Sequence, residues 1–556
     1  MTTGAPHNVA RFLREHAQAR PDAPALTVPA DGYTTDAPVW STTRYGELDE
    51  ASDRVAEGLA QQGVIPGDRT LVLVQPGPEL YIAVFALFKI GAVPVILDPG
   101  MGLKGLLSCI QRTRPRVMIA DSRVHLLSRL RPSPFASVRI RVTLGRRWLW
   151  GGVTWGQLQA TPTDTPRALL DLDPDAPAAL LFTSGSTGPA KGVIARHGML
   201  GAQVELLREM LGVQAGWTDL QAFAGFALFD LCLGMHAALP KMNLSRPATA
   251  RPEELLAAYR TLEPEVAFGS PVVWQNLARH ALASGSTLPS LRVALTVGAP
   301  IPAYLHQRLL QVFAPERQIF TPYGATEALP IAWIGTDEIL SETWAATSQG
   351  AGTCVGAPVP HTQVRIIDVT DAPLASFDET RQLAAGELGE IVVEGPQVSR
   401  AYADADEANL HAKIQDGTRT WHRMGDLGYL DAQGRLWFCG RKAHRLQTPA
   451  GIVPAVPVEG IFNEHPDVFR TALVGVGSVG AHRPVLCVEL EPDRAWSTSL
   501  PRELAALAEG TPYAGLVQQF LHHPGFPTDA RHNSKIRRED LAPWATRQCG
   551  HEEPSS

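Results

Sequence analysis

The sequence predicts an α/β protein with a large N-terminal domain of helix-covered β-sheets and a small α+β C-terminal domain. Apolar strand patterns alternate with amphipathic helix patterns through most of the chain, which is typical of parallel sheets covered by helices. A charged and proline-rich stretch follows Gly440. The length of 556 residues fits one large and one smaller domain, and we place the boundary between 1–440 and 441–556.

The helices are predicted from apolar residues that recur with helical spacing. The helix at 8–20 ends before Pro21, and the helix at 45–62 has Leu48, Val55 and Leu59 on one face. Further helices are predicted at 79–89, 200–211, 252–262, 272–282 and 458–464. Strands are predicted at 70–74, 93–97, 178–182, 266–268, 292–297, 318–320, 471–474 and 485–490. Residues 430–438 indicate a hairpin, and the tail is expected to fray from about Gln548.

Composition and charge exclude several classes of protein. With 45% hydrophobic and 19% charged residues, the chain is not a disordered protein. A net charge of −7 argues against a nucleic-acid-binding protein. The six cysteines form no C-x-x-C pair, which indicates reduced thiols rather than a zinc site or a disulfide framework.

Targeting signals are not expected. The N-terminal residues lack the apolar core of a secretory signal. Lys89, Gly91 and Pro94 interrupt the most apolar stretch, 80–97, so a helix followed by a buried strand explains it better than a transmembrane segment. We expect a cytoplasmic protein.

The strongest chemical signal is the stretch LFTSGSTGPAKGV at 181–193. Small residues let the backbone approach an anion, hydroxyl and amide groups donate hydrogen bonds, and a lysine adds charge, which suits a polyphosphate. A Walker loop has a glycine before its lysine and a serine or threonine after it, whereas here Ala190 and Gly192 occupy these two positions. A flexible linker is the alternative for such a stretch, but a linker rarely follows a strand and ends in Lys-Gly. The predicted phosphate-binding residues are Thr183, Ser184, Gly185, Ser186, Thr187, Gly188 and Lys191.

This loop resembles the signature of the adenylate-forming enzymes, which include acyl-CoA synthetases, peptide-synthetase adenylation domains and luciferases. Three further motifs follow in the order of that family. The resemblance covers roughly residues 8–545 and implies ATP and Mg²⁺ as cofactors. It also implies that the C-terminal domain is a mobile lid.

The second motif, 321–327, resembles the family's Y-G-x-T-E. The resemblance implies that Tyr323 stacks on adenine beside Gly324 and Ala325, that Thr326 contacts the α-phosphate, and that Glu327 holds Mg²⁺. These roles fit a flat aromatic face, a hydroxyl donor and a hard carboxylate oxygen. Upstream, Gly298, Ala299 and Pro300 resemble the adenine-side turn.

The third and fourth motifs lie toward the C-terminus. By resemblance, Asp426 accepts hydrogen bonds from the ribose hydroxyls and Arg441 reaches the ribose or a phosphate. Lys535, in a run similar to the family's final P-x-T-x-x-G-K, would neutralise charge as a carboxylate attacks the α-phosphate. At the family's usual hinge position, which normally holds Asp or Lys, the chain has Ala443. The neighbouring Lys442 is the candidate to serve as the hinge residue instead.

Several segments are similar to one group within the family, the β-lactone synthetases of bacterial long-chain olefin biosynthesis. These segments are 98–102, 321–330, 440–445 and 531–535. The implied reaction converts a long-chain β-hydroxy acid and ATP into a β-lactone, AMP and pyrophosphate. The implied partners are an olefin-pathway condensing enzyme, a reductase and a β-lactone decarboxylase.

The base for ring closure and the acyl pocket are the least defined parts of the site. His197 is the candidate base by position, and a structural core histidine is an equal alternative. The acyl pocket is expected to use Phe226, Leu228, Phe229, Met235, Val272 and Trp274, each of which also suits an ordinary core. Asp230 follows Phe229 where many acyl-CoA synthetases have a histidine.

Two alternatives to a lactone-forming enzyme stay open. A long-chain acyl-CoA or acyl-carrier ligase would pass the acyl group to a thiol. The other alternative is an inactive adenylate-binding scaffold. An inactive protein could lose its site residues without harm to the fold, so the presence of Lys191, Glu327, Asp426 and Lys535 argues against this alternative.

Overall fold

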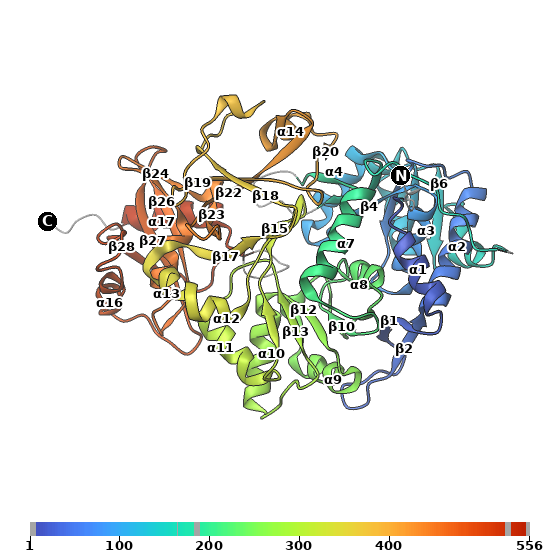
Figure 1. The fold of residues 1–556 in the computed structure, drawn as a ribbon, viewed down its shortest axis with the longest axis horizontal. Coiled ribbons are helices and arrows are strands. Elements are labelled where there is room, and N and C mark those ends of the chain that lie inside the picture. Colours follow the sequence, from blue (N-terminus) through green and yellow to red (C-terminus); the bar gives the residue numbers. More distant parts are fainter. Residues whose placement is uncertain (1–6, 164, 183–189, 529–534, 552–556) are drawn as a thin grey trace.

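The computed structural model describes residues 7–163, 165–182, 190–528 and 535–551. Figure 1 shows the N-terminal segment, drawn in blue and cyan, at one end of the molecule and the residues after about 440, drawn in orange and red, at the other. Among the described residues, no helix is long and apolar enough to cross a membrane.

An eight-stranded sheet, mostly parallel, forms the first layer. Its strands, in spatial order, are β20 (Tyr402–Ala403), β9 (Gly192–Arg196), β8 (Pro177–Phe182), β4 (Val93–Leu97), β3 (Arg69–Leu73), β5 (Val117–Asp121), β6 (Ile140–Leu144) and β7 (Val153–Thr154). The helices that accompany it are α2 (Tyr45–Gln61), α3 (Pro78–Lys89), α4 (Gly102–Thr113), α5 (Ser122–Leu130), α6 (Trp155–Gln159) and α7 (His197–Leu211). At its edge, β20 returns from far along the chain to pair with β9.

A seven-stranded sheet forms the second layer. Its order is β14 (Gln318–Phe320), β13 (Val293–Thr296), β12 (Val266–Gly269), β10 (Thr218–Gln221), β11 (His236–Ala238), β1 (Pro24–Pro29) and β2 (Trp40–Arg44). The helices of this part are α1 (Arg11–Ala19), α8 (Ala227–Leu233), α9 (Pro252–Leu262), α10 (Pro271–Ala283) and α11 (Ala303–Val312). All neighbours from β1 to β14 are parallel, so their carboxyl ends meet at one edge.

An antiparallel sheet of eight strands joins these layers to the C-terminal region. It comprises β15 (Tyr323–Ala325), β16 (Ala328–Trp333), β17 (Thr353–Pro358), β23 (Leu436–Arg441), β22 (Arg419–Leu430), β19 (Gly389–Glu394) and β18 (Gln363–Ile367), with β21 (Lys413–Asp416) beside β22. Short helices α12 (Thr336–Glu338), α13 (Trp344–Ala346) and α14 (Asp406–Ala412) connect them.

The elements after Arg441 build a two-stranded and a three-stranded sheet of their own. They are β24 (Leu446–Thr448), β25 (Gly451–Val453), α15 (Ala455–Phe462), β26 (Val468–Val476), β27 (Arg483–Leu490), α16 (Leu500–Leu507), β28 (Gln519–His522) and α17 (Arg538–His551). The fold class predicted from the sequence is confirmed, whereas the boundary between 440 and 441 stays a prediction. The expected fraying from Gln548 is wrong as far as His551, because α17 continues to that residue.

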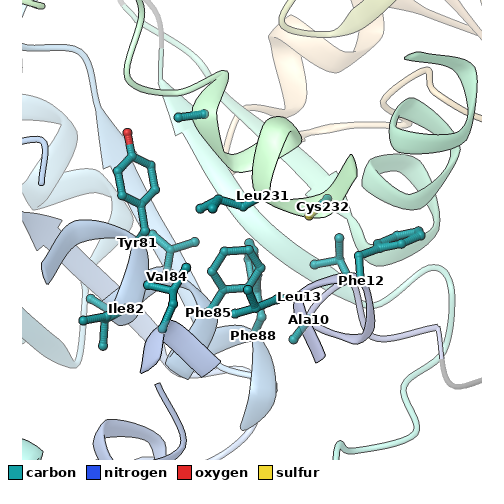
Figure 2. Packing of buried hydrophobic residues seen from close by; sticks show 14 of the residues in the cluster. Ala10, Phe12, Leu13, Tyr81, Ile82, Val84, Phe85, Phe88, Leu231 and Cys232 are labelled. Carbon is teal, nitrogen blue, oxygen red and sulfur yellow. The ribbon is translucent and has the colours of Figure 1, made fainter. Parts of the chain in front are cut away.

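The largest core cluster surrounds α3, in which every residue from Tyr81 to Lys89 is buried. Figure 2 shows Tyr81, Phe85 and Phe88 packed against residues of α1 and α8. Lys89 ends this apolar helix in an ion network. Its ammonium lies 2.6 Å from Asp49 Oδ1 and 2.7 Å from Asp53 Oδ1. Arg14 pairs with both carboxylates from α1, so the buried charges are balanced.

Candidate active site

The Tyr-Gly-x-Thr-Glu motif lies on a hairpin that follows the last parallel strand, β14. Tyr323 begins β15, and Thr326 and Glu327 form the turn that leads into β16. A Cβ at Gly324 would lie 2.6 Å from the carbonyl oxygen of Ala328, so only glycine fits this close pairing. The hairpin therefore carries the motif past the carboxyl edge of the seven-stranded sheet, where ligands of α/β proteins commonly bind.

Asp426 is the centre of a buried polar group on this side of the molecule. The Tyr323 hydroxyl donates a 2.6 Å hydrogen bond to Asp426 Oδ2. Asp426 and Arg441 are paired residues on β22 and β23, and Arg441 Nη1 lies 2.9 Å from Asp426 Oδ1. Burial raises the pKa of Asp426, while the charges of Arg441 and Lys535 act in the opposite direction. The structure thus brings together Tyr323, Asp426 and Arg441, which are far apart in the sequence.

Lys535 is exposed, and its charge acts on the pKa of Asp426. Lys535 is therefore near enough to the predicted ribose-binding carboxylate for its charge to favour the ionised form. Next to the predicted hinge, Lys442 Nζ donates to the carbonyl of Thr370 at 2.8 Å and lies 2.9 Å from Glu390 Oε2. Glu390 also pairs with Arg423, at 2.6 Å. These contacts anchor the chain to the antiparallel sheet immediately before Ala443.

Glu327 has a partner that no sequence motif indicates. The Tyr402 hydroxyl donates a 2.7 Å hydrogen bond to Glu327 Oε1. Lys191 Nζ lies 5.3 Å from the centre of the Tyr402 ring, and Lys413 Nζ lies 5.4 Å from it. An aromatic face attracts cations at these distances. Tyr402 therefore contacts the predicted metal-binding carboxylate and the predicted phosphate-binding lysine at once.

Lys413 is a buried cation beside this group. It donates a hydrogen bond of 3.0 Å to the Ser399 hydroxyl, and the Ser399 amide donates at 2.7 Å to the Glu327 carbonyl. Burial lowers the pKa of Lys413 to about 7, although the charge of Glu327 opposes this shift. Burial and the charge of Lys413 also lower the pKa of His422 well below its usual value.

The predicted phosphate loop connects two paired strands. Thr183, Ser184, Gly185, Ser186, Thr187 and Gly188 lie outside the described residues, so their predicted contacts stay predictions. The strands on either side, β8 and β9, pair through Phe182 and Gly192. A Cβ at Gly192 would lie 2.5 Å from the Phe182 ring. Lys191 directly precedes this close contact and is thereby directed toward Tyr402.

The predicted adenine-side turn follows β13. Gly298 has a φ of 101°, a left-handed conformation that favours glycine, and Ala299 and Pro300 come next. Because β13 and β14 are parallel neighbours, this turn and Thr321 leave the sheet at the same edge. The placement agrees with a shared nucleotide site.

His197 does not occupy the position expected of a base. It is completely buried at the start of α7, where its Nδ1 accepts a 3.2 Å hydrogen bond from the Val9 amide. Its ring packs edge-on against Phe88 in the core. Burial lowers its pKa to about 4. These contacts support the structural alternative, so we no longer assign the base to His197.

The residues expected in the acyl pocket divide between two faces of the seven-stranded sheet. Phe226, Leu228, Phe229 and Met235 belong to the core cluster around α3 and α8. Trp274 belongs to another cluster, where its indole donates to the carbonyl of Leu295 at 3.0 Å. Trp274 thus lies in a different cluster from Phe226, and its part in the acyl pocket stays a prediction.

Comparisons with known proteins agree with this geometry. The family model described as "AMP-binding enzyme" matches residues 13–403. The chain belongs to the AMP-binding enzyme family. Curated relatives of this enzyme include the olefin beta-lactone synthetase of Xanthomonas campestris pv. campestris, 44% identical over 97% of this chain and 98% of the relative. The protein of the same name from Stenotrophomonas maltophilia has the same identity and coverage.

Solved structures support the fold of this AMP-binding enzyme. The amide bond synthetase McbA from Marinactinospora thermotolerans has a TM-score of 0.78 at 22% identity, with 97% of this chain and 100% of that chain covered. The Bacillus subtilis o-succinylbenzoate-CoA synthetase MenE, solved with ATP and magnesium ion, has a TM-score of 0.73 at 22% identity. That match covers 97% of this chain and 99% of the other.

The side chains of this AMP-binding enzyme suit a magnesium ion that is held jointly with a nucleotide. Within the described ranges, no three His, Cys, Asp or Glu residues gather into a metal-binding group. Glu327 therefore offers a single carboxylate, oriented by Tyr402. Mg²⁺ commonly binds through one or two carboxylates together with phosphate oxygens and water, so this donor set fits it.

Proposed function

We propose that this enzyme is an ATP-dependent β-lactone synthetase that acts on a long-chain 2-alkyl-3-hydroxy fatty acid. The observation that carries the proposal is the 44% identity, over nearly the full length, to two proteins named olefin beta-lactone synthetase. The grouping of Tyr323, Asp426 and Arg441 at one edge supports an adenosine site in this chain.

The first step forms an acyl-adenylate. The substrate carboxylate attacks the α-phosphorus of ATP and pyrophosphate leaves. Lys535, Thr326 and Lys191 stabilise the charge that develops on the phosphate oxygens. Asp426 and Arg441 orient the ribose, and Tyr323 lies against the adenine. Glu327 would hold Mg²⁺, which neutralises phosphate charge.

The second step needs no other substrate. The hydroxyl on the β-carbon attacks the activated carbonyl carbon, the bond to the AMP oxygen breaks, and a four-membered lactone forms. An intramolecular nucleophile held near its target gains several kcal/mol over a separate molecule, roughly 7 to 11 kcal/mol in the best cases. Water must be excluded because it would hydrolyse the acyl-adenylate.

An assay without coenzyme A tests this function. Purified protein is incubated with ATP, Mg²⁺ and a 2-alkyl-3-hydroxy fatty acid, and the products are followed by NMR and by release of AMP and pyrophosphate. We expect a β-lactone without any thiol. A product that is only a thioester and appears only with coenzyme A would instead identify a long-chain acyl-CoA ligase.

We further propose a cytoplasmic location and an assembly with the enzymes on either side of the reaction. The β-hydroxy acid is the product of a ketone reduction, and a β-lactone that loses CO₂ yields an alkene. A reductase, a β-lactone decarboxylase and the upstream condensing enzyme are therefore the expected partners. Co-purification of these proteins from cell extract, compared with an extract lacking this chain, tests the assembly.

A further inference from the structure

Two buried aspartates and a glutamine gather inside the N-terminal domain, apart from the nucleotide site. Asp219 and Gln221 are two residues apart on β10, so their side chains point to the same face of the sheet. Gln221 Nε2 donates a 2.8 Å hydrogen bond to Asp219 Oδ2. Asp230 comes from α8 and lies close enough to Asp219 that the two carboxyl groups shift each other's pKa. We call these three residues the carboxyl cluster.

The carboxyl cluster is buried and incompletely satisfied. Asp219 and Gln221 are 2% exposed and Asp230 is 4% exposed. Among the described residues, Asp219 Oδ1, Asp230 Oδ2 and Gln221 Oε1 have no hydrogen-bond partner. Burial raises the pKa of Asp219 to about 7, and burial together with the charge of Asp219 raises that of Asp230 well above its usual value. The pair therefore retains at least one proton near neutral pH.

A cluster of this kind would reduce the stability of the fold if its role were only structural. An unsatisfied buried polar group lowers the stability of the fold, and a charged one lowers it more. Elsewhere in this core, cations balance the charges of buried carboxylates, since Lys89 and Arg14 pair with Asp49 and Asp53. Buried carboxyl groups with strongly shifted pKa values and no balancing cation are typical of functional sites.

The surroundings of the carboxyl cluster match an acyl pocket. Phe268, the register partner of Gln221 on β12, stacks on Phe226 at 4.3 Å. Phe226 in turn contacts Phe223 and Phe229, and these three rings are only partly buried. The strands β10 and β12 end at the same edge from which the turn at Gly298 and the Thr321 segment emerge. The partly buried rings of Phe223, Phe226 and Phe229 thus gather near the carboxyl end of β10, at the edge that carries the nucleotide-binding motifs.

The unpaired amide oxygen of Gln221 indicates which kind of ligand group would bind in the carboxyl cluster. The amide oxygen Gln221 Oε1 is an acceptor in every protonation state. A ligand group that satisfies it must donate a hydrogen bond, which excludes a carboxylate or phosphate and fits a hydroxyl. In an otherwise apolar pocket, one buried acceptor group selects substrates with a hydroxyl at one position.

We propose that Asp219, Gln221 and Asp230 form the subsite that receives the substrate's β-hydroxyl group and takes its proton during ring closure. This inference rests on the proposed function. The hydroxyl oxygen forms a bond to the carbonyl carbon, and the bond from that carbon to the AMP oxygen breaks, so that AMP leaves with the electron pair. The proton passes to the ionised oxygen of the aspartate pair and returns to water when the lactone departs.

The variants Asp230→Asn and Asp219→Asn test the subsite, because they keep the shape of the side chain and remove the proton acceptor. Two activities are measured on the full-length protein: substrate-dependent exchange of pyrophosphate into ATP, which reports adenylation, and lactone formation by NMR. We expect lactone formation to fall about 100-fold or more, the usual contribution of a general base. Pyrophosphate exchange, measured at saturating substrate, should fall much less than lactone formation, and acyl-AMP should accumulate.

The matched variant Asp230→Glu keeps the carboxyl group and should restore part of the lactone formation that Asp230→Asn loses. Equal losses of both activities in the asparagine variants would show a structural role and overturn the subsite. Unchanged lactone formation would overturn it as well. If wild type itself makes only a thioester, the proposed function and the subsite both fail, whereas a wild-type lactone with unaffected variants removes only the subsite.

A measurement on the unmodified protein covers the case in which the variants do not fold. Binding of the 3-hydroxy acid is compared with binding of its 3-deoxy analogue in the absence of ATP. A hydrogen bond to a charged or buried acceptor is worth about 1.5 to 3 kcal/mol, so the deoxy acid should bind at least about tenfold more weakly. Equal affinity would overturn the subsite.

Discussion

The hydroxyl of Tyr402 donates a 2.7 Å hydrogen bond to Oε1 of Glu327, a residue 75 positions earlier in the chain. This contact exists because β20 adds to the edge of the eight-stranded sheet beside β9, with Tyr402 opposite Val193. Lys191, which precedes β9, lies against the same tyrosine ring. One side chain therefore connects the phosphate loop to the carboxylate expected to bind the metal.

Replacement of Tyr402 by phenylalanine should weaken metal use without loss of the fold. Partners that orient a metal-binding side chain typically contribute about 10- to 100-fold to metal affinity. We expect a similar rise in the Mg²⁺ concentration that gives half-maximal adenylation, measured by pyrophosphate exchange. The matched control is Tyr429→Phe, whose hydroxyl donates instead to the carbonyl of Ala351. An unchanged Mg²⁺ requirement in Tyr402→Phe would contradict this role.

Replacement of Lys535 by alanine should abolish most acyl-adenylate formation. Loss of one group that stabilises transition-state charge lowers turnover by about 100- to 1,000-fold. Lys535 is exposed, so the thermal midpoint should not change. Arg537→Ala serves as the control, because that exposed arginine pairs with Asp540. Pyrophosphate exchange at the wild-type rate in Lys535→Ala would disprove the assignment.

Replacement of Lys89 by methionine should strongly destabilise the N-terminal domain. The lysine is fully buried, and its loss leaves Asp49 and Asp53 with Arg14 as their remaining cation in the network. Breaking a buried ion pair costs about 3 to 5 kcal/mol. Urea unfolding followed by tryptophan fluorescence measures the change. The exposed Lys104→Met on α4 should shift the free energy of unfolding by less than about 0.5 kcal/mol; a similar loss in both variants would refute the argument.

Acid should destabilise the fold between about pH 6.5 and pH 4. Burial lowers the pKa of His197, His236, His306 and His444 to about 4, while histidine in an unfolded chain titrates near 6.5. In this window the unfolded chain binds more protons than the folded chain. The stability that these histidines contribute is therefore fully present above pH 6.5 and is lost as the pH falls through 4. Each histidine contributes about 1.4 kcal/mol per pH unit.

The variant His197→Gln isolates one of these histidines. Its thermal midpoint should depend less steeply on pH between 6.5 and 4 than that of wild type. The exposed His411→Gln should follow the wild-type curve. Identical pH dependence in His197→Gln and wild type would show that His197 does not contribute to acid sensitivity.

Much of the fold could be predicted because its signals are local. Strand β4 occupies Val93–Leu97 and helix α9 occupies Pro252–Leu262, as the apolar spacing indicates. Helix α1 is shorter than predicted, from Arg11 to Ala19, because the chain leaves helical geometry at Arg20. Strand β6, Ile140–Leu144, is not among the predicted strands; it lies near the sheet edge and is only partly buried, so its apolar pattern is weak.

The alternation of strands and helices follows from the residues alone, as does the order of four motifs that resemble a nucleotide-activating site. The folded arrangement was needed to show that Tyr402 and Lys413 lie beside Glu327, that His197 is enclosed in the core, and that Asp219 and Asp230 meet. Spacing along a chain indicates which face of a strand or helix is buried. Which distant element covers that face depends on the order and pairing of strands in the assembled sheets, and no local pattern contains that information.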